Sequence, residues 1–371
     1  MPASRSSSVL VVGAGIVGLA AAWQLAKQGH AVTLVDPALA AGHPSADSGS
    51  RAALGVLMAQ VFHRSSGRAW RLRQHSHALW NQWLAALDQR GYHLPRRQGL
   101  LLLAGTPEEL EKQQRIAADR ARLGIPMQSL AAEELEAFHP HLPGQPLGGL
   151  LSPGDGQLDP GPVMAALLAE ATKAGVCCVA EAAVALGRGK AWRLELAGGG
   201  RLEANWLVLA LGLGTSPLLE CLGHGLAQEP VLGQALELEL EQDPRWNWPG
   251  AVLWRGINLV PRPDLGGSGR RLWLGATLEP GALASDQALA ELRELGGDAP
   301  SWLQNAAVVR QWHGLRCHPQ GQPAPVLAEP EPGLLIASGY YRNGVLLAPA
   351  SAAWLCERIS GIRYPVAELA S

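Results

Sequence analysis

A glycine-rich turn near the start of the chain constrains the fold more than any other feature. Residues 9–12 form a short apolar run, which is typical of a buried parallel strand. Gly13-Ala14-Gly15-Ile16-Val17-Gly18 follows, and apolar residues at helical spacing continue to Gly29. A second apolar run, residues 31–35, ends at Asp36. This order of strand, glycine turn, helix, strand and acid predicts a dinucleotide-binding unit.

Each residue of this unit has a defined task in holding a dinucleotide. Gly13 permits the tight turn, Gly15 lets the backbone approach the pyrophosphate, and Gly18 lets the helix pack closely on the strand. The amino end of the helix offers N–H groups and a partial positive charge to the phosphates. Asp36 can accept hydrogen bonds from a ribose and would repel the 2′-phosphate of NADP. The turn by itself does not separate FAD from NAD.

Composition narrows the class of protein. The 371 residues carry a formal net charge of -2 and a pI of 6.6, which provides no cationic face for a nucleic acid. No apolar run reaches the roughly 18 residues of a transmembrane helix, so we expect no integral membrane segment. The five cysteines lack metal-ligand spacing and suit a reducing compartment. Without a recognisable targeting segment, we expect a cytoplasmic protein that holds no metal.

The rest of the chain alternates between helical and strand patterns. Helices are expected over 69–90, from Thr106-Pro107 to Gly124, over 161–175 and over Pro349–Ser360. Strands are expected over 176–180, in a hairpin of Trp192–Ala197 and Arg201–Ala210, and in alternating runs between Val231 and Trp312. The pattern predicts an α/β fold in which a Rossmann-type domain is interleaved with an antiparallel-sheet domain.

Two further segments carry a resemblance to a known family. Ser48-Gly49-Ser50-Arg51-Ala52-Ala53-Leu54-Gly55-Val56-Leu57 resembles the second flavin-contacting loop of the D-amino acid oxidase superfamily. The segment Gly339-Tyr340-Tyr341-Arg342-Asn343-Gly344-Val345-Leu346-Leu347-Ala348-Pro349, here called the signature loop, resembles that of ThiO-type glycine oxidases. Weaker matches at Asp159-Pro160, 204–212 and 272–277 follow in family order. The resemblance implies FAD as cofactor and the glutathione-reductase-like FAD fold of this family.

The resemblance also implies how the chain is divided and which residues contact FAD. An FAD-binding domain is expected over 1–60, 145–218 and 325–371, and a substrate-binding domain over 61–144 and 219–324. A glycine loop at the start of a helix directs N–H dipoles at the flavin region where negative charge develops on reduction. The expected FAD contacts are Gly13, Ala14, Gly15, Ile16, Val17, Gly18, Asp36, Ser50, Ala53, Gly55, Leu57, Gly212, Gly339, Arg342, Asn343, Gly344, Val345 and Leu346.

The amino-acid site is expected around Arg316. Gly314-Leu315-Arg316 is similar to a family motif whose arginine clamps the substrate carboxylate, a bidentate task that suits a guanidinium. Arg342 would be a second catalytic charge near the same site. Asn258 stands where related glycine oxidases carry a tyrosine whose hydroxyl helps to hold the carboxylate. Either Tyr340 or Tyr341 can supply the missing hydroxyl, and the sequence leaves this choice open.

Other polar groups next to Arg316 have less defined roles. Cys317 replaces the family's proline, and in related sarcosine oxidases a cysteine in this region bonds covalently to the flavin. We interpret Cys317 as an inert thiol, with covalent attachment as the alternative. His313 and His318 flank Arg316 as possible bases, but exposed histidines at a turn are the commoner case. No side-chain base is needed if the substrate amine binds in its neutral form.

The resemblance implies oxidation of a small amine. The expected substrate is an amino acid or secondary amine (glycine, sarcosine or a D-amino acid), oxidised by hydride transfer to flavin N5 and hydrolysed to the oxo acid. Dioxygen would be reduced to hydrogen peroxide, and thiamine biosynthesis is the implied pathway. The alternatives are a dehydrogenase with a non-oxygen acceptor, an oxidase of a tRNA-linked amine, a flavin protein without turnover, and a flavin-free NAD dehydrogenase. The sequence leaves homo-oligomer formation open.

Overall fold

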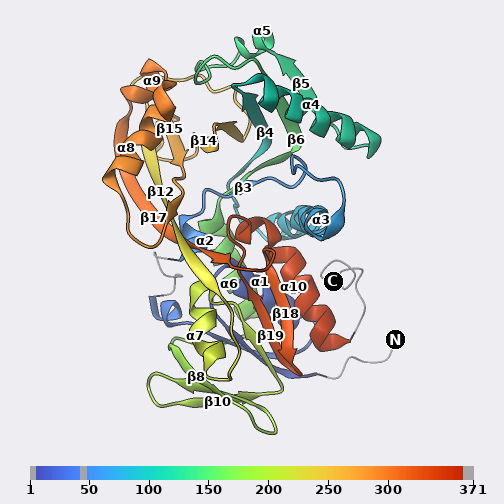
Figure 1. The fold of residues 1–371 in the computed structure, drawn as a ribbon. Helices are drawn as coiled ribbons and strands as arrows, with labels where there is room; N and C mark the ends of the chain where they lie inside the picture. The colour runs from blue at the N-terminus through green and yellow to red at the C-terminus, as the bar shows by residue number, and fades with distance from the viewer. Residues whose placement is uncertain (1–5, 42–47, 362–371) are drawn as a thin grey trace.

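A six-stranded, mainly parallel sheet forms one half of the protein. The computed structural model describes residues 6–41 and 48–361 (Figure 1). The strands lie in the order β18 (Val326–Glu331), β19 (Leu334–Ser338), β11 (Trp206–Leu209), β1 (Ser8–Val12), β2 (Ala31–Val35) and β7 (Cys177–Val179). Only the β18–β19 pair is antiparallel. The strands predicted at 9–12, 31–35 and 176–180 are confirmed.

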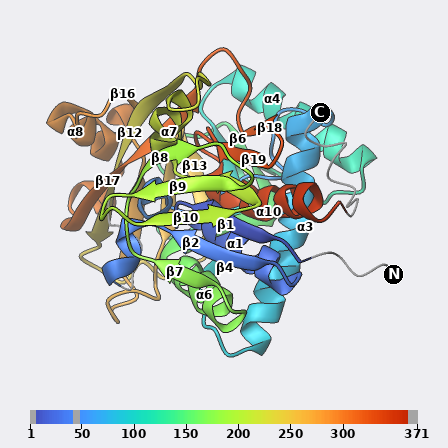
Figure 2. The same cartoon turned by 90° about the horizontal axis from the view of Figure 1, so that it is seen from below.

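Different layers cover the two faces of this sheet. Val9 and Val11 of β1 pack into the core beneath the helices, whereas Leu10 and Val12 face a small three-stranded sheet. Figure 2 shows the small sheet lying across the six strands. The covering helices are α1 (Ile16–Lys27), α3 (Gly67–Gln89), α6 (Pro160–Lys173) and α10 (Gly344–Ser360). The other face carries β8 (Ala183–Gly187), β9 (Trp192–Leu196), β10 (Arg201–Ala204) and α7 (Thr215–Glu220).

A ten-stranded sheet forms the other half, in the upper part of Figure 1. Its main path runs β16 (Glu279–Pro280), β12 (Gln228–Glu239), β15 (Arg271–Gly275), β14 (Ile257–Pro261), β13 (Ala251–Trp254), β4 (Arg96–Ala104), β6 (Gly148–Leu158) and β3 (Val56–Leu57). β17 (Ala307–Pro319) pairs with β12, and β5 (Gln128–Ala131) pairs with β6. The β13–β4 pair is parallel, so the sheet is mixed where antiparallel pairing alone was predicted. Helices α4 (Pro107–Arg122), α5 (Ala132–Leu135), α8 (Asp286–Glu294) and α9 (Ser301–Gln304) belong to this half.

The predicted start of α4 is confirmed, whereas the predicted start of α10 is wrong. Thr106 caps α4 by accepting a hydrogen bond from the Glu109 N–H, as its sequence predicts. The last helix, in contrast, begins at Gly344 and contains Pro349, which was predicted to start it. Pro349 has no N–H for the carbonyl of Val345 four residues earlier. Trp80 of α3 donates its Nε1–H to that carbonyl at 3.0 Å, so the tertiary contact replaces the missing helical bond.

The predicted second strand of the hairpin is two strands. Arg201–Ala204 pairs with β9, but residues 206–209 join the parallel sheet beside β1. Asn205 lies between them, and its N–H donates to Ser8 Oγ at 2.9 Å. The chain therefore leaves the small sheet at Asn205, where Ser8 fixes it at the start of β1.

No helix in the described ranges is long and apolar enough to cross a membrane. The five cysteines are free thiols, of which Cys317 and Cys356 are buried.

Candidate active site

Loops at one edge of the parallel sheet form the candidate cofactor site. Gly13 follows β1, Asp36 follows β2, Gly212 follows β11 and Gly339 follows β19. These four neighbouring strands are parallel, so their carboxyl ends lie at the same edge of the sheet. Ligands of open α/β sheets bind at this edge. The structure thus brings these four residues together, although the first, Gly13, and the last, Gly339, are more than 300 residues apart in sequence.

The first turn has no room for side chains. Gly13 has φ +106°, and a Cβ there would lie 2.6 Å from the Ala210 carbonyl oxygen. A Cβ on Gly18 would overlap the Gly13 carbonyl oxygen, so the helix lies directly on the turn. Gly15 is the N-cap of α1 and makes no side-chain cap, so the amino end of the helix is open to an anion except at the Ile16 N–H, which donates to Ser50 Oγ.

We expect Gly18→Ala to reduce the amount of FAD that co-purifies with the chain. The added methyl group separates α1 from the turn, and overpacking of this kind costs about 1–3 kcal/mol. The measurement is the ratio of flavin absorbance to protein absorbance after gel filtration. Gly225→Ala is the matched control, because Gly225 has open space around its Cβ position. An unchanged flavin ratio in Gly18→Ala would contradict the assignment of this turn.

Asp36 braces the turn that it follows. Its Oδ2 accepts a hydrogen bond from the Ala14 N–H at 2.7 Å, and its Oδ1 accepts one from the Ala38 N–H at 2.8 Å. The carboxylate therefore stands next to the first glycine turn, as a ribose-binding acid must. Its contact with a ribose stays a prediction.

A short segment, α2 (Gly49–Ala52), connects the glycine turn to the strand that carries Arg316. Ser50 Oγ accepts a hydrogen bond from the Ile16 N–H at 3.1 Å. On its other side, the Ala52 carbonyl accepts one from Trp312 Nε1 at 3.0 Å. A Cβ on Gly314 would overlap the Ala52 side chain, so α2 lies flat against β17. A cofactor at the glycine turn and a substrate at Arg316 would both border α2.

Residues 53–57, at the end of the predicted flavin-contacting segment, pack against the core and against β6. Gly55 has φ +73°, and a Cβ there would overlap the Leu158 carbonyl oxygen. Leu57 lies in β3 and is buried in the core beneath the helices. Ala53 packs against the same core. Close packing against β6 explains the glycine at position 55, and the predicted FAD contacts of these three residues stay predictions.

The signature loop is fixed at both ends. Gly339 has φ +64° and lies against Val326 and Pro319, where a Cβ would be 2.9 Å from Val326 Cγ2. The preceding Ser338 donates its hydroxyl to the Gly212 carbonyl at 3.0 Å, which joins the ends of β19 and β11. Asn343 does not cap α10. Its Oδ1 instead accepts a hydrogen bond from Arg73 Nη1 at 2.9 Å.

These features fit an FAD. The first-turn N–H groups of α10 at Gly344, Val345 and Leu346 have no side-chain cap, so they can face a developing negative charge. The side chains of Val345 and Leu346 are buried in the core and only their backbone can serve a cofactor. The glycine turn and the amino ends of α1 and α10 would hold the pyrophosphate and the flavin.

The two tyrosines of the signature loop point to different surroundings. The Tyr340 hydroxyl donates to Ser351 Oγ at 2.7 Å inside the core, and burial raises the pKa of this phenol. Tyr341 has φ +53° and stacks on His318, with ring centroids 4.4 Å apart. Its N–H donates to the Cys317 carbonyl at 2.9 Å. The Tyr340 hydroxyl is therefore occupied in the core, and a role for the Tyr341 hydroxyl in the site stays a prediction.

Arg316 is a half-buried cation that forms no ion pair with a carboxylate in the described part of the chain, although the negative charge of Glu279 acts to raise its pKa. Its Nη1 donates to the carbonyls of Leu232 (3.1 Å) and Thr277 (3.0 Å). The guanidinium lies over Gly233, where any Cβ would overlap it. Burial and the positive charge of Arg342 lower the pKa of Arg316 to about 10. Neutral carbonyls orient the group and leave its charge for an anionic ligand.

The other residues predicted near Arg316 differ in exposure and in the face of the sheet on which they lie. Arg342 is exposed and forms no hydrogen bond or ion pair within residues 6–41 and 48–361. Both histidines lie on strand β17, so the expectation of a turn is wrong. His318 shares the face of Arg316, and His313 lies on the opposite face. Burial raises the pKa of Cys317, and a protonated thiol is a poor nucleophile.

Asn258 lies in β14, on the ten-stranded sheet, with 8% of its surface exposed. Its Oδ1 is buried and has no hydrogen-bond partner. The structure therefore places an unsatisfied acceptor at the position that the resemblance matches to a tyrosine of glycine oxidases.

Three buried polar groups around the site were not among the residues predicted from the sequence. Arg73 lies on the apolar face of α3, and burial lowers its pKa to about 10. A charged residue between Trp70 and Trp80 on that face was the available signal. Glu279 accepts hydrogen bonds from Thr277 and Gln234, which surround the carbonyl that Arg316 contacts. The third group is an ion cluster at Arg262.

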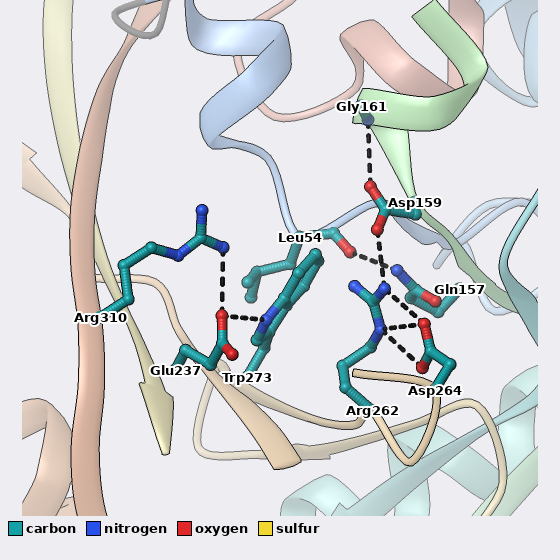
Figure 3. Close-up of polar contacts among 9 residues, drawn as sticks. All are labelled: Leu54, Gln157, Asp159, Gly161, Glu237, Arg262, Asp264, Trp273 and Arg310. Atoms are coloured by element: carbon teal, nitrogen blue, oxygen red, sulfur yellow. Dashed lines mark hydrogen bonds and ion pairs between the residues drawn. The ribbon is translucent and has the colours of Figure 1, made fainter. Parts of the chain in front are cut away.

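The Arg262 cluster joins the two halves of the protein. Arg262 is 1% exposed and donates to Asp159 Oδ2 and Asp264 Oδ2, each at 2.7 Å. Figure 3 shows its guanidinium between the two carboxylates and beside the Trp273 ring, at 3.8 Å from the ring centroid. Asp159 also caps α6 by accepting from the Gly161 N–H at 3.0 Å. Arg262, just after β14, is thereby tied to a helix of the dinucleotide-binding half.

Comparisons with known proteins agree with this geometry. The profile of a family described as FAD dependent oxidoreductase matches residues 8–358. Glycine oxidase of Geobacillus kaustophilus (strain HTA426) is 31% identical over 351 residues, which cover 92% of this chain and 89% of that protein. The crystal structure of glycine oxidase from Geobacillus kaustophilus matches with a TM-score of 0.85 at 27% identity, covering 97% of this chain and 96% of that chain. L-α-glycerophosphate oxidase from Mycoplasma pneumoniae, with FAD bound, shares the fold at 19% identity and a TM-score of 0.79, covering 97% of this chain and 96% of that chain.

Proposed function

Because the chain belongs to the DAO family of FAD-dependent oxidoreductases, we propose that it oxidises a small amino acid or secondary amine whose carboxylate binds Arg316. FAD is its cofactor. The observation that carries the proposal is the state of Arg316: a half-buried guanidinium held by two backbone carbonyls, with no carboxylate partner in the described ranges. Such a cation favours a ligand that brings its own negative charge.

The chain supplies orientation and charge. Arg316 fixes the carboxylate in a bidentate geometry, and Arg342 adds a second positive charge, which already lowers the pKa of Arg316. The Tyr341 hydroxyl takes the place of the strand tyrosine found in related glycine oxidases. The His318 ring lies against the Tyr341 ring, with the centroids 4.4 Å apart. Positioning of this kind is a main contribution of the protein in cofactor enzymes.

When bound, FAD would supply the two-electron oxidation that removes the Cα–H of the amine as a hydride and leaves an imine, and dioxygen would reoxidise the cofactor with formation of hydrogen peroxide. The uncapped amino end of α10 supplies N–H dipoles for the charge that develops there. We assign no side chain as general base, since His313 lies on the far face of β17 and His318 is stacked on Tyr341. Without a side-chain base, the substrate amine would have to react in its neutral form.

The test is a substrate panel on the FAD-bound protein. Glycine, sarcosine and D-alanine are mixed anaerobically with the protein, and the loss of flavin absorbance is followed. Admission of air and a peroxide assay then separate an oxidase from a dehydrogenase. We expect bleaching by at least one amine and its recovery with peroxide in air. Protein that retains FAD and is bleached by no amine would refute the proposal.

A further inference from the structure

Arg73 of α3 is a buried cation that contacts the signature loop. Helix α3 packs against α10 (Figure 2), and Arg73 lies on its buried face with 9% of its surface exposed. The Arg73 Nη1 donates to Asn343 Oδ1 at 2.9 Å and to the Met58 carbonyl at 3.4 Å. The guanidinium carbon lies 4.2 Å from the centroid of the Phe62 ring. Burying a charge is costly, and an apolar side chain would pack this face of the helix without that penalty.

Arg73 fixes which end of the Asn343 carboxamide faces the core. A guanidinium has only donors, so it binds the carboxamide through its oxygen and leaves its nitrogen free. Asn343 Nδ2 forms no hydrogen bond in the described part of the chain, and Asn343 is only partly buried. The carboxamide therefore holds its acceptor against Arg73 and keeps its donor for a group outside the chain.

The same contact leaves the amino end of α10 uncapped. An asparagine just before a helix commonly accepts a hydrogen bond with its Oδ1 from an N–H of the first turn. Asn343 has φ -117° and ψ 14° instead of an extended backbone, and its side chain caps nothing. The N–H groups of Gly344, Val345 and Leu346 form no hydrogen bond within residues 6–41 and 48–361. The polar groups that this end of the helix offers to a ligand are therefore all donors.

This end of the helix is accessible to a cofactor. Asn343 and Gly344 are both partly exposed, and the nearest non-neighbouring atom to a Cβ on Gly344 would be Tyr340 Cβ, at 3.8 Å. The signature loop follows β19 at the edge of the parallel sheet where the dinucleotide-binding turn also lies. A flavin gains negative charge on reduction, and N–H donors at the amino end of a helix stabilise such a charge.

We propose that Arg73 is a positioning residue that raises the reduction potential of the bound FAD. By holding Asn343 Oδ1, Arg73 keeps the amino end of α10 free of a side-chain cap and directs only hydrogen-bond donors at the cofactor. The inference rests on FAD as the cofactor and is independent of the substrate and of Arg316. An Arg73 with a purely structural role would connect α3 to the signature loop without affecting the potential.

The test is the reduction potential of the FAD-bound protein, measured by equilibration with a redox dye in the absence of any amine. In Arg73→Met the Asn343 oxygen is released and can accept an N–H of α10, so the reduced cofactor loses a donor. We expect the ratio of reduced to oxidised FAD at a given potential to fall about tenfold, which is about 30 mV for a two-electron couple. Arg73→Lys keeps a cation that only donates and should recover much of this shift.

Three further variants separate this role from a general effect of charge. Asn343→Ala leaves no carboxamide to orient, so adding Arg73→Met to it should lower the potential much less than Arg73→Met alone. Arg64→Met removes an exposed cation from the segment before α3 and should leave the potential unchanged. Asn343→Asp keeps an oxygen for Arg73 but replaces the free donor with an acceptor, so it should lower the potential at least as far as Arg73→Met.

Flavin content and the midpoint of thermal unfolding are recorded for each variant. A wild-type potential in FAD-loaded Arg73→Met would overturn the inference and make Arg73 a structural residue, whatever its unfolding midpoint. An equal shift with and without Asn343 would also overturn it, because Arg73 would then act by its charge alone. If Arg73→Met does not retain FAD, Asn343→Asp decides, and an unchanged potential in that variant would overturn the inference. None of these results depends on the substrate, so the substrate panel tests the proposed function separately.

Discussion

Arg316→Ala is expected to lower kcat/KM for the amino-acid substrate by about 10²–10⁴-fold. Two hydrogen bonds from a guanidinium to a carboxylate are each worth about 1.5–3 kcal/mol, and each 1.4 kcal/mol corresponds to a factor of ten. The loss is large because Arg342, the other charge expected near the substrate carboxylate, is exposed to solvent. Steady-state kinetics with the substrate that bleaches the flavin provide the measurement.

Two variants make this result specific. Arg316→Lys keeps the charge but not the planar fork, so it should recover only part of the activity. Arg310 lies on the same strand six residues earlier, and Arg310→Ala loses an ion pair with Glu237 and a contact with the Trp312 ring but no group that faces the substrate carboxylate, so it should retain wild-type kcat/KM. The flavin content of each variant shows whether it has folded. An Arg316→Ala enzyme with full FAD content and an unchanged KM would exclude Arg316 as the carboxylate ligand.

Arg262→Ala is expected to destabilise the protein by about 3–5 kcal/mol, because it leaves the buried carboxylate of Asp159 without its cation. Burial alone would lower the pKa of Arg262, but the hydrogen bonds and charges of Asp264 and Asp159 outweigh burial and raise it. Burial likewise would raise the pKa of Asp264, but Arg262 outweighs it and lowers that pKa. The midpoint of thermal or urea unfolding, followed by flavin release, measures the loss.

Comparison variants separate this cluster from an ordinary ion pair. Arg122 pairs with Asp119 on the surface, so Arg122→Ala should change stability by no more than about 1 kcal/mol. The triple change Arg262→Met, Asp159→Asn, Asp264→Asn removes all three charges and should recover much of the loss, because asparagine still caps a helix. An Arg262→Ala protein as stable as the wild type would show that the cluster does not hold the two halves together.

Short-range patterns gave reliable predictions of individual elements. The turn at Gly13–Gly18 and the cap at Thr106 depend on residues within a few positions of each other, and the structure contains both of them. The interactions involved are backbone conformation and local hydrogen bonds, which one segment specifies without the rest of the chain.

Elements whose limits depend on distant partners were predicted less well. α10 runs through Pro349 because Trp80 satisfies the carbonyl that the proline leaves free. The run 201–210 divides at Asn205 because Ser8 holds it there. Both partners are well over 100 residues away in sequence, and no local pattern contains them.

The dinucleotide-binding turn and its acid could be identified from the order of residues, and Arg316 from the resemblance of its neighbours to a family motif. Only the tertiary structure decided what those groups can do. It directs the Tyr340 hydroxyl to Ser351 and places the Tyr341 ring against His318. It also gives Arg316 carbonyl partners instead of a carboxylate, and leaves Asn258 Oδ1 without a donor. The availability of a polar group depends on what packs against it, and packing brings together residues from distant parts of the chain.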